Sequence, residues 1–289
     1  MKPYAIREIA KKYVDNDMIQ AHTELPDMPE PRLRALYSFL NQQQSPEKQS
    51  ELYTLVIFLV QMGMDTHDLI DTDNRKCSEQ DMRSRQLKVL AGDYFSARFY
   101  QLLSQSGEID MVSRISRAVC EVNRLKVNLY LRMRQLKMTA EDYMGQSVEL
   151  RSVLFLLFAE VMDSSLSNFW PEALEAIAKC ELAAYEMERC GNPAEFGQSW
   201  AYWHILQAGT EEERQLLADG SPSQETVEGL IKKYNVYNQL SASLKQAADA
   251  VKAVADKLES EPLATELNRI AETIVNNHTG FTPALNETR

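Results

Sequence analysis

Glycine and proline are scarce in this sequence, with ten of each among 289 residues. Strands joined by tight turns use both residue types heavily, so their scarcity favours helices over an all-β or α/β fold. The cysteines are also few, and no two form a CxxC pair: Cys77, Cys120, Cys180 and Cys190. This spacing predicts neither a zinc cluster nor a disulfide framework, and we expect free thiols in a cytoplasmic protein.

Excess positive charge and long apolar runs are absent as well. The formal net charge is −11, which disfavours nucleic acid as a partner and equally disfavours binding to anionic lipid through a polybasic patch. The longest apolar run, residues 55–60, is far too short to cross a bilayer, so we expect no transmembrane segment. The first residues, MKPYAIREIAKKYVDND, are charged throughout, and we expect no signal peptide.

Common catalytic motifs are missing from the chain. It contains no GxxxxGK[ST], no GxGxxG and no GxSxG, which argues against nucleotide-binding and hydrolase families built on these motifs. The four histidines are isolated in the sequence: His22, His67, His204 and His278. None has the spacing of a zinc pair or a Glu-x-x-His di-iron motif, so we expect no zinc or iron site on this chain.

Helical periodicity is what the sequence does contain. It predicts a single all-α domain over residues 1–289, a bundle of roughly ten helices. Residues 1–30 read as a short helix and a Pro-rich linker, residues 222–259 as one long helix, and residues 279–289 as a frayed tail. Thr139 and Asp142 have the spacing of a capping box at a helix start, and Ser106-Gly107 is typical of a helix end.

An acidic segment, THDLID, occupies residues 66–71, shortly after the apolar run. It places His67, Asp68 and Asp71 at the i, i+1 and i+4 spacing that gathers side chains on one side of a helix end. Carboxylates in this arrangement hold Mg²⁺, which in turn holds a diphosphate. A neutral imidazole brings no negative charge and binds Mg²⁺ poorly, so this box predicts at most one weakly held ion.

The segments after the box resemble the trans-polyprenyl diphosphate synthases. The box, the basic pair Arg75-Lys76 and the helix VLAGDYFSARFYQLL correspond to that family's HDDxxD, Arg-Arg-Gly and GDYLLA elements. The segments VQMGMDTH and RQLKVLAGDYFS resemble more narrowly the component 1, or small-subunit, family of bacterial heptaprenyl diphosphate synthases. The resemblance extends over about residues 30–275 and implies the all-α bundle of the isoprenoid synthase type.

The departures from the catalytic pattern are as informative as the likeness. Either His67 stands where the first aspartate belongs, or Leu69 replaces the second, depending on how the box is aligned. The whole chain contains no Asp-Asp dipeptide, so the family's second aspartate-rich motif is missing. Electrostatic stabilisation is commonly the largest catalytic contribution, so we expect a chain without this metal cage to be inactive alone.

The resemblance therefore implies a small subunit with no catalytic residue and no metal of its own. It implies a heterodimer in which a large partner holds Mg²⁺ and elongates farnesyl diphosphate with isopentenyl diphosphate, giving heptaprenyl diphosphate for the menaquinone side chain. Prenyl diphosphates would reach this chain only through the complex, where Arg75 and Lys76 are candidate diphosphate contacts. The product could also draw the complex to the membrane periphery.

In the family the GDY helix lies at the subunit interface, which makes six of its residues interface candidates: Gly92, Asp93, Tyr94, Phe95, Phe99 and Tyr100. A glycine inside a helix costs about 1 kcal/mol, so Gly92 is interpreted as a position of close helix packing. The box His67, Asp68 and Asp71 is interpreted as a relic that stabilises a helix end or a subunit contact, with a residual metal or diphosphate contact as the alternative. Two other functions stay open: an autonomous Mg²⁺-dependent prenyltransferase or terpene cyclase with an atypical box, and a helical adaptor.

Overall fold

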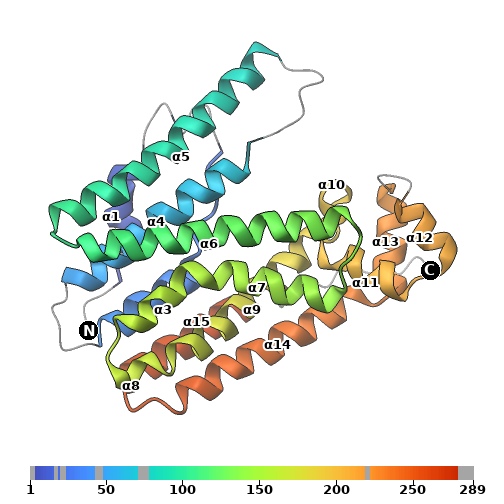
Figure 1. Ribbon diagram of the computed structural model, residues 1–289. Helices are drawn as coiled ribbons and strands as arrows, with labels where there is room; N and C mark the ends of the chain where they lie inside the picture. The colour runs from blue at the N-terminus through green and yellow to red at the C-terminus, as the bar shows by residue number, and fades with distance from the viewer. Residues whose placement is uncertain are drawn as a thin grey trace. The chain divides into compact units, whose positions relative to one another are not determined.

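The computed structural model describes residues 4–15, 19, 24–42, 48–70, 78–218 and 222–278. All regular secondary structure within these residues is helical, which confirms the all-α class (Figure 1). The chain divides into two compact units, Met1–Arg117 and Ala118–Arg289. The single-domain organisation stays a prediction. No helix of the described segments is long and apolar enough to span a membrane.

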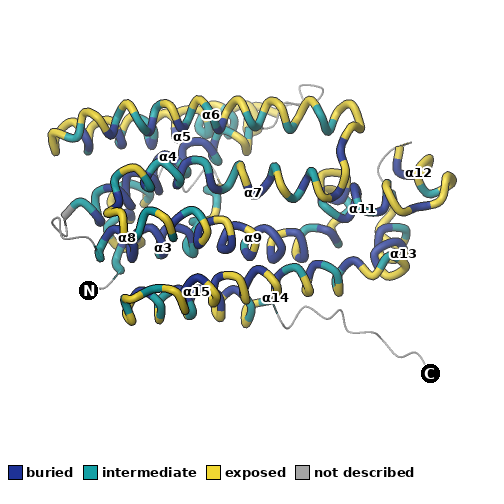
Figure 2. Tube along the Cα trace, turned by 60° about the horizontal axis from the view of Figure 1, so that its bottom comes forward, coloured by how far each residue is buried: buried dark blue, intermediate teal, exposed yellow. Residues whose placement is uncertain are grey.

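The first unit is built around one buried helix. Its helices are α1 (Ile6–Val14), α3 (Glu30–Leu40), α4 (Lys48–Asp68) and α5 (Glu79–Gln105). Residues 53–60 of α4 are all buried, and α4 packs against α5, α3 and α1 (Figure 2). The apolar run of the sequence is therefore a core helix, and its C-terminal end carries the acidic box.

Two glycines allow α4 and α5 to approach closely. A β-carbon on Gly63 of α4 would lie 2.9 Å from Ser96 Oγ and 3.0 Å from the Gly92 carbonyl oxygen of α5. Either distance is shorter than side chains normally tolerate, so a larger residue at position 63 would push the helices apart. This contact brings the last turns of α4 against the middle of α5, where the GDY segment lies.

The second unit surrounds α9. Helix α6 (Ile109–Arg134) leads into it, and the others are α7 (Ala140–Leu156), the 3₁₀ turn η1 (Leu157–Glu160), α8 (Ser164–Ser167), α9 (Trp170–Arg189), α10 (Pro193–Phe196), α11 (Trp200–Ala208), α12 (Glu211–Ala218), α13 (Gln224–Lys233), α14 (Val236–Ala255) and α15 (Glu261–His278). Helix α9 packs against α7, α14 and α15. Trp170, fully buried at the start of α9, donates its indole N–H to the Phe155 carbonyl at 3.0 Å.

Several local predictions can be compared with this structure. The capping box of Thr139 and Asp142 is confirmed at the start of α7. The helix end predicted at Ser106-Gly107 is confirmed too: α5 ends at Gln105, with Ser106 as its C-cap and Gly107 at φ +77°. The single helix predicted over residues 222–259 is wrong. It is interrupted at Asn235, which adopts a left-handed conformation with φ +51°, a state that asparagine tolerates better than most residues. The tail 279–289 lies outside the described residues.

Candidate functional site

The acidic box begins in the last turn of α4, which is well supplied with hydrogen bonds. Thr66 is fully buried and donates its hydroxyl to the Met62 carbonyl at 2.6 Å. Lys88 of α5 donates its ammonium group to the Leu69 carbonyl at 3.0 Å. A cation at a helix C-terminus offsets both the helix dipole and the nearby acids. Asp71, Arg75 and Lys76 lie outside the described residues, so their diphosphate or metal contacts stay predictions.

His67 connects the box to the GDY segment. A β-carbon on Gly92 would lie 2.6 Å from Nε2, 2.7 Å from Cε1 and 2.8 Å from Cδ2 of the His67 ring. The imidazole therefore occupies the space that any other residue at position 92 would need. Its Nε2 also lies 3.4 Å from Asp93 Oδ1, with the His67 side chain 37% exposed. The interpretation of Gly92 as a packing position agrees with this geometry.

The described part of the box does not fit a magnesium cage. Its donors are the His67 ring, which packs against α5, and the exposed carboxylate of Asp68. Imidazole nitrogen is a poor ligand for Mg²⁺, which prefers several carboxylate and water oxygens in octahedral geometry. Among the described residues, no three His, Cys, Asp or Glu side chains gather closely enough to hold a metal ion.

The six interface candidates on α5 differ in exposure. Phe95 and Phe99 are 0% and 4% exposed, and Gly92 is buried, so these three belong to the core of the first unit. Asp93 and Tyr100 are exposed, and Tyr94 is half-buried with Arg98 stacked on its ring at 4.9 Å. A partner could reach only the exposed members directly, and their interface role stays a prediction.

A buried carboxylate in the second unit was not anticipated from the sequence. Glu186 of α9 is 0% exposed and accepts hydrogen bonds from the Tyr143 hydroxyl at 2.8 Å and the Trp200 backbone N–H at 2.6 Å. Arg189 Nη1 lies 3.7 Å from the same carboxylate. Burial raises the pKa of Glu186, and Arg189 opposes the shift. The only sequence signal is its position four residues after the buried Leu182, on the apolar side of the helix.

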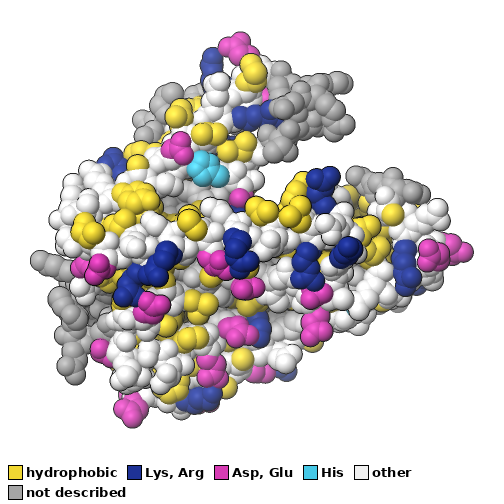
Figure 3. All heavy atoms as spheres, viewed as in Figure 1, with side chains coloured by type: hydrophobic (Ala, Val, Ile, Leu, Met, Phe, Trp, Pro, Cys, Tyr) yellow, Lys and Arg dark blue, Asp and Glu magenta, His cyan; other side chains and the backbone are white. Residues whose placement is uncertain are grey.

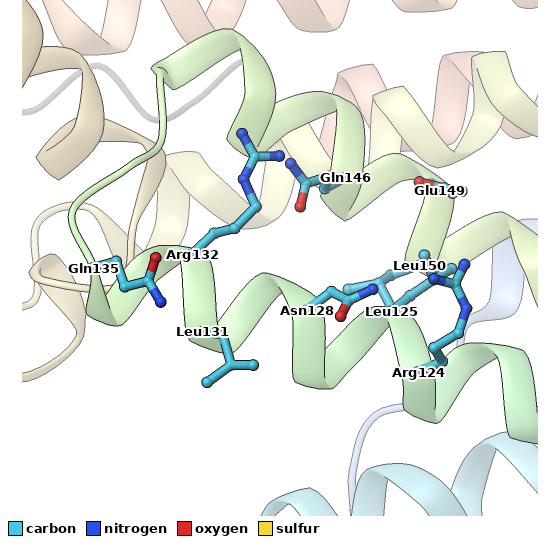
Figure 4. Close-up of a pocket in the computed structure, with 9 residues that line it drawn as sticks. All are labelled: Arg124, Leu125, Asn128, Leu131, Arg132, Gln135, Gln146, Glu149 and Leu150. Carbon is cyan, nitrogen blue, oxygen red and sulfur yellow. The ribbon is translucent and has the colours of Figure 1, made fainter.

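A groove of about 570 Å³ lies between α6 and α7 in the second unit (Figure 4). Leucines and carboxamides share its lining with two arginines and one glutamate: Arg124, Leu125, Asn128, Leu131, Arg132, Gln135, Gln146, Glu149 and Leu150. Arg132 points toward α7, whereas Leu131 points away from it (Figure 4). Both arginines have carboxylate partners, Glu121 for Arg124 and Asp142 for Arg132.

Comparison with known families shows which family this chain belongs to. A family model described as heptaprenyl diphosphate synthase (HEPPP synthase) subunit 1 matches residues 16–176, more than half of the chain. The chain belongs to this subunit 1 family. Heptaprenyl diphosphate synthase component 1 of Geobacillus stearothermophilus is 39% identical over 82 residues, which are 28% of this chain and 35% of that protein. The matched segment thus spans about a third of the curated relative.

Solved structures show that this subunit 1 chain has the trans-prenyl synthase fold. A decaprenyl diphosphate synthase from Rhodobacter capsulatus aligns with a TM-score of 0.68 at 15% identity, covering 95% of this chain and 99% of that one. A geranylgeranyl pyrophosphate synthase from Lactobacillus brevis aligns with a TM-score of 0.73 at 14% identity, covering 94% of both chains. At such low identity the likeness establishes the fold alone, and the isoprenoid synthase type predicted from the sequence is confirmed.

Proposed function

We propose that this chain is the non-catalytic but required subunit of a heterodimeric heptaprenyl diphosphate synthase. The observation that carries the proposal is the packing of His67, the histidine of the acidic box, against Gly92 rather than toward an open metal site. Membership of the subunit 1 family supports it, as does the absence of any Asp-Asp dipeptide from the sequence.

The chemistry belongs to the partner in this proposal. Ionising an allylic diphosphate builds negative charge on the leaving group, and Mg²⁺ held by carboxylates stabilises that charge. The large subunit supplies both aspartate boxes and the Mg²⁺, and it joins isopentenyl diphosphate to farnesyl diphosphate. The product is heptaprenyl diphosphate for the menaquinone side chain, in keeping with the relative named heptaprenyl diphosphate synthase component 1.

We place the partner contact on the exposed side of α5. Leu90 is 62% exposed, Val89 40% and Tyr100 48%, and Asp93 lies on the same helix. Exposed apolar side chains mixed with aromatic ones are typical of a protein interface. The buried Phe95 and Phe99 hold this surface in place from beneath, because they anchor α5 to the core of the first unit.

Co-expression with a large subunit that carries two DDxxD motifs tests the proposal. We expect the two chains to co-purify and prenyl transfer from farnesyl and isopentenyl diphosphate to need both. Leu90→Asp should weaken the association at least tenfold, since it desolvates a charge in the contact. Leu216→Asp on α12, where Leu216 is 47% exposed, is the matched control and should leave association unchanged.

Three results would contradict the proposal. Full activity of the large subunit alone would show that this chain is not required. Mg²⁺-dependent turnover by the isolated chain, lost on Asp68→Ala, would show an autonomous enzyme. Failure of the two chains to co-purify, together with stable binding to a protein that is no synthase, would identify a helical adaptor.

A further inference from the structure

A groove of about 330 Å³ lies between α14 and α15 in the second unit. Four apolar residues form its floor: Leu244, Ala248, Ala271 and Val275. Its edges carry charges of both signs, with Lys245 and Lys252 on α14 and Glu272 on α15. Figure 3 shows such charged side chains among hydrophobic ones in the lower part of the view, where α14 lies in Figure 1. The groove therefore suits a peptide that has one apolar side and a few charges.

The groove begins where α15 ends. Helices α14 and α15 pack together and are joined only by residues 256–260, so they run antiparallel and His278 comes near the first turns of α14. His278 Nδ1 lies 2.7 Å from the Ile274 carbonyl oxygen, and its Nε2 lies 3.0 Å from Glu188 Oε1 of α9. These two contacts fix the point from which the following residues leave the helix, and His278 itself lines the groove.

The segment 279–289, which follows α15, reads TGFTPALNETR and has the pattern of an extended peptide. Gly280 suits a reversal of the chain directly after a helix, and the residue before Pro283 favours an extended conformation. Apolar residues alternate along the segment with smaller or more polar ones: Phe281, Pro283 and Leu285 with Thr282, Ala284 and Asn286. Because successive side chains of an extended chain point to opposite sides, the first three share one side.

The length and charge of this segment match the groove. Between Ser241 and Lys252 the groove follows α14 for about 16 Å, at a rise of about 1.5 Å per residue. Residues 281–286 span about 16 Å when extended, at about 3.3 Å per residue. Glu287 then reaches the far end of the groove, beside Lys252. Within the described residues neither Lys245 nor Lys252 forms an ion pair with a carboxylate, so Lys252 is available to Glu287.

We infer that residues 279–289 fold back from α15 and bind in the groove between α14 and α15, with Phe281 and Leu285 on its apolar floor. The segment is covalently joined to the mouth of the groove, so its effective concentration there is on the order of millimolar. Even a weak fit is therefore occupied, and a second copy or a separate partner must first displace the segment. The inference does not depend on the proposed synthase function.

Thiol labelling of the groove floor tests the inference. Val275→Cys places a thiol there, and mass spectrometry of its peptide follows alkylation by N-ethylmaleimide separately from the native cysteines. In the full-length chain we expect this labelling to be roughly fivefold slower, or more, than in the same variant shortened after His278, because only the open fraction reacts. Phe281→Ser with Leu285→Ser should raise the rate close to that of the shortened chain. Ala248→Cys is a second labelling position and should give the same result.

Charge reversal tests the register of the segment in the groove. Lys252→Glu should speed labelling about twofold, a small change because an exposed ion pair contributes little. Adding Glu287→Lys to that variant should restore the parent rate. Lys232→Glu, at an exposed position of α13, is the matched control and should leave the rate unchanged. Thr282→Ser with Asn286→Ser, on the opposite side of the segment, should also leave it unchanged.

Three results would overturn the inference. The first is an equal labelling rate with and without residues 279–289. The second is protection that persists in Phe281→Ser with Leu285→Ser. The third is protection that increases with protein concentration, which would show that a second copy covers the groove. Circular dichroism of every variant checks that the rates compare folded chains.

Discussion

The imidazole of His67 lies where a β-carbon on residue 92 would be, 2.6 Å from Nε2. The histidine that breaks the acidic box and the glycine of the GDY segment therefore form one packing contact between α4 and α5. Asp93, next to that glycine, completes it with Oδ1 3.4 Å from His67 Nε2. Two sequence features that the family pattern treats separately are one structural unit in this chain.

The effect of Gly92→Ala on the free energy of unfolding should change sign with the residue at position 67. In the parent chain we expect a loss of about 1 kcal/mol in the free energy of unfolding, because the ring must move and overpacking commonly costs about 1–3 kcal/mol. In a His67→Ala background we expect a gain of about 1 kcal/mol, because alanine is the better helix former. Urea unfolding of the four proteins in this double-mutant cycle measures the coupling.

Gly63→Ala is the control for that cycle. Its new β-carbon would lie 3.0 Å from the Gly92 carbonyl oxygen, a backbone atom that cannot rotate away. This variant should therefore be destabilised by a similar amount whichever residue occupies position 67. If Gly92→Ala costs the same with and without His67, the packing role assigned to the histidine is wrong.

Restoring a carboxylate at position 67 should not restore a metal site. His67→Asp places a second negative charge beside Asp93, so we expect it to be less stable than His67→Asn by about 0.5 kcal/mol, a difference that salt reduces. Millimolar MgCl₂ should not raise its melting temperature, and the isolated chain should show no prenyl transfer. A Mg²⁺-dependent rise in melting temperature would mean that only the histidine keeps the box from binding metal.

The all-α class and the break in the acidic box could be predicted because they depend on local patterns. Apolar spacing, the capping box at Thr139 and the missing Asp-Asp dipeptide are all visible without tertiary information. Gly92 was also predictable as a packing position, since its cost in a helix requires a compensating contact. Its partner His67 was not, because a contact between α4 and α5 depends on how the two helices cross.

Two further features depended on contacts distant in sequence. The break at Asn235 interrupts a segment whose apolar spacing continues on both sides, so periodicity alone predicted one helix. Gln239 donates its side-chain N–H to the Tyr234 carbonyl at 2.9 Å and approaches His204 Nε2 of α11, which helps to hold the break. Glu186 was missed because its partners Tyr143 and Trp200 come from α7 and α11.

Glu213 should make stability sensitive to acid. Its carboxylate accepts hydrogen bonds from Lys233 Nζ and the Tyr234 hydroxyl, both at 2.6 Å, and from the Thr210 N–H at 2.9 Å. The Lys233 hydrogen bond, followed by the other two, lowers the pKa of Glu213 from 4.5 to about 2. A lowered pKa contributes stability above the unfolded value and loses it as pH falls toward the folded value.

Glu213→Gln should therefore lower the free energy of unfolding by about 1 kcal/mol near neutral pH, a modest figure because Lys233 is half exposed. Between pH 4.5 and 2 the parent chain should lose stability more steeply than the variant. Guanidinium unfolding across that range measures the two slopes. Glu212→Gln, at an exposed neighbouring position of α12, is the control. Parallel slopes for parent and Glu213→Gln would refute the assignment.

Glu186 should make the stability of the fold depend on pH in the opposite direction to Glu213. Burial raises its pKa, so protonation is more favoured in the folded state than in the unfolded state, and stability falls as pH rises from the unfolded pKa through the folded one. Glu186→Gln keeps the shape, and its carbonyl can accept the Trp200 N–H while its amide donates to Tyr143. We expect this variant to stay within about 1 kcal/mol of the parent and to lack that pH-dependent loss.

Glu186→Ala is the contrasting change, because it leaves the Trp200 N–H and the Tyr143 hydroxyl without their acceptor and removes the carboxylate that lies 3.7 Å from Arg189 Nη1. Breaking a buried charged pair typically costs about 3–5 kcal/mol, and we expect a loss of that size. Unfolding by urea from pH 5 to 8, a window above the usual carboxyl pKa, separates the two variants. If Glu186→Gln is destabilised as strongly as Glu186→Ala, the ionised carboxylate itself is required, and Arg189 outweighs the effect of burial.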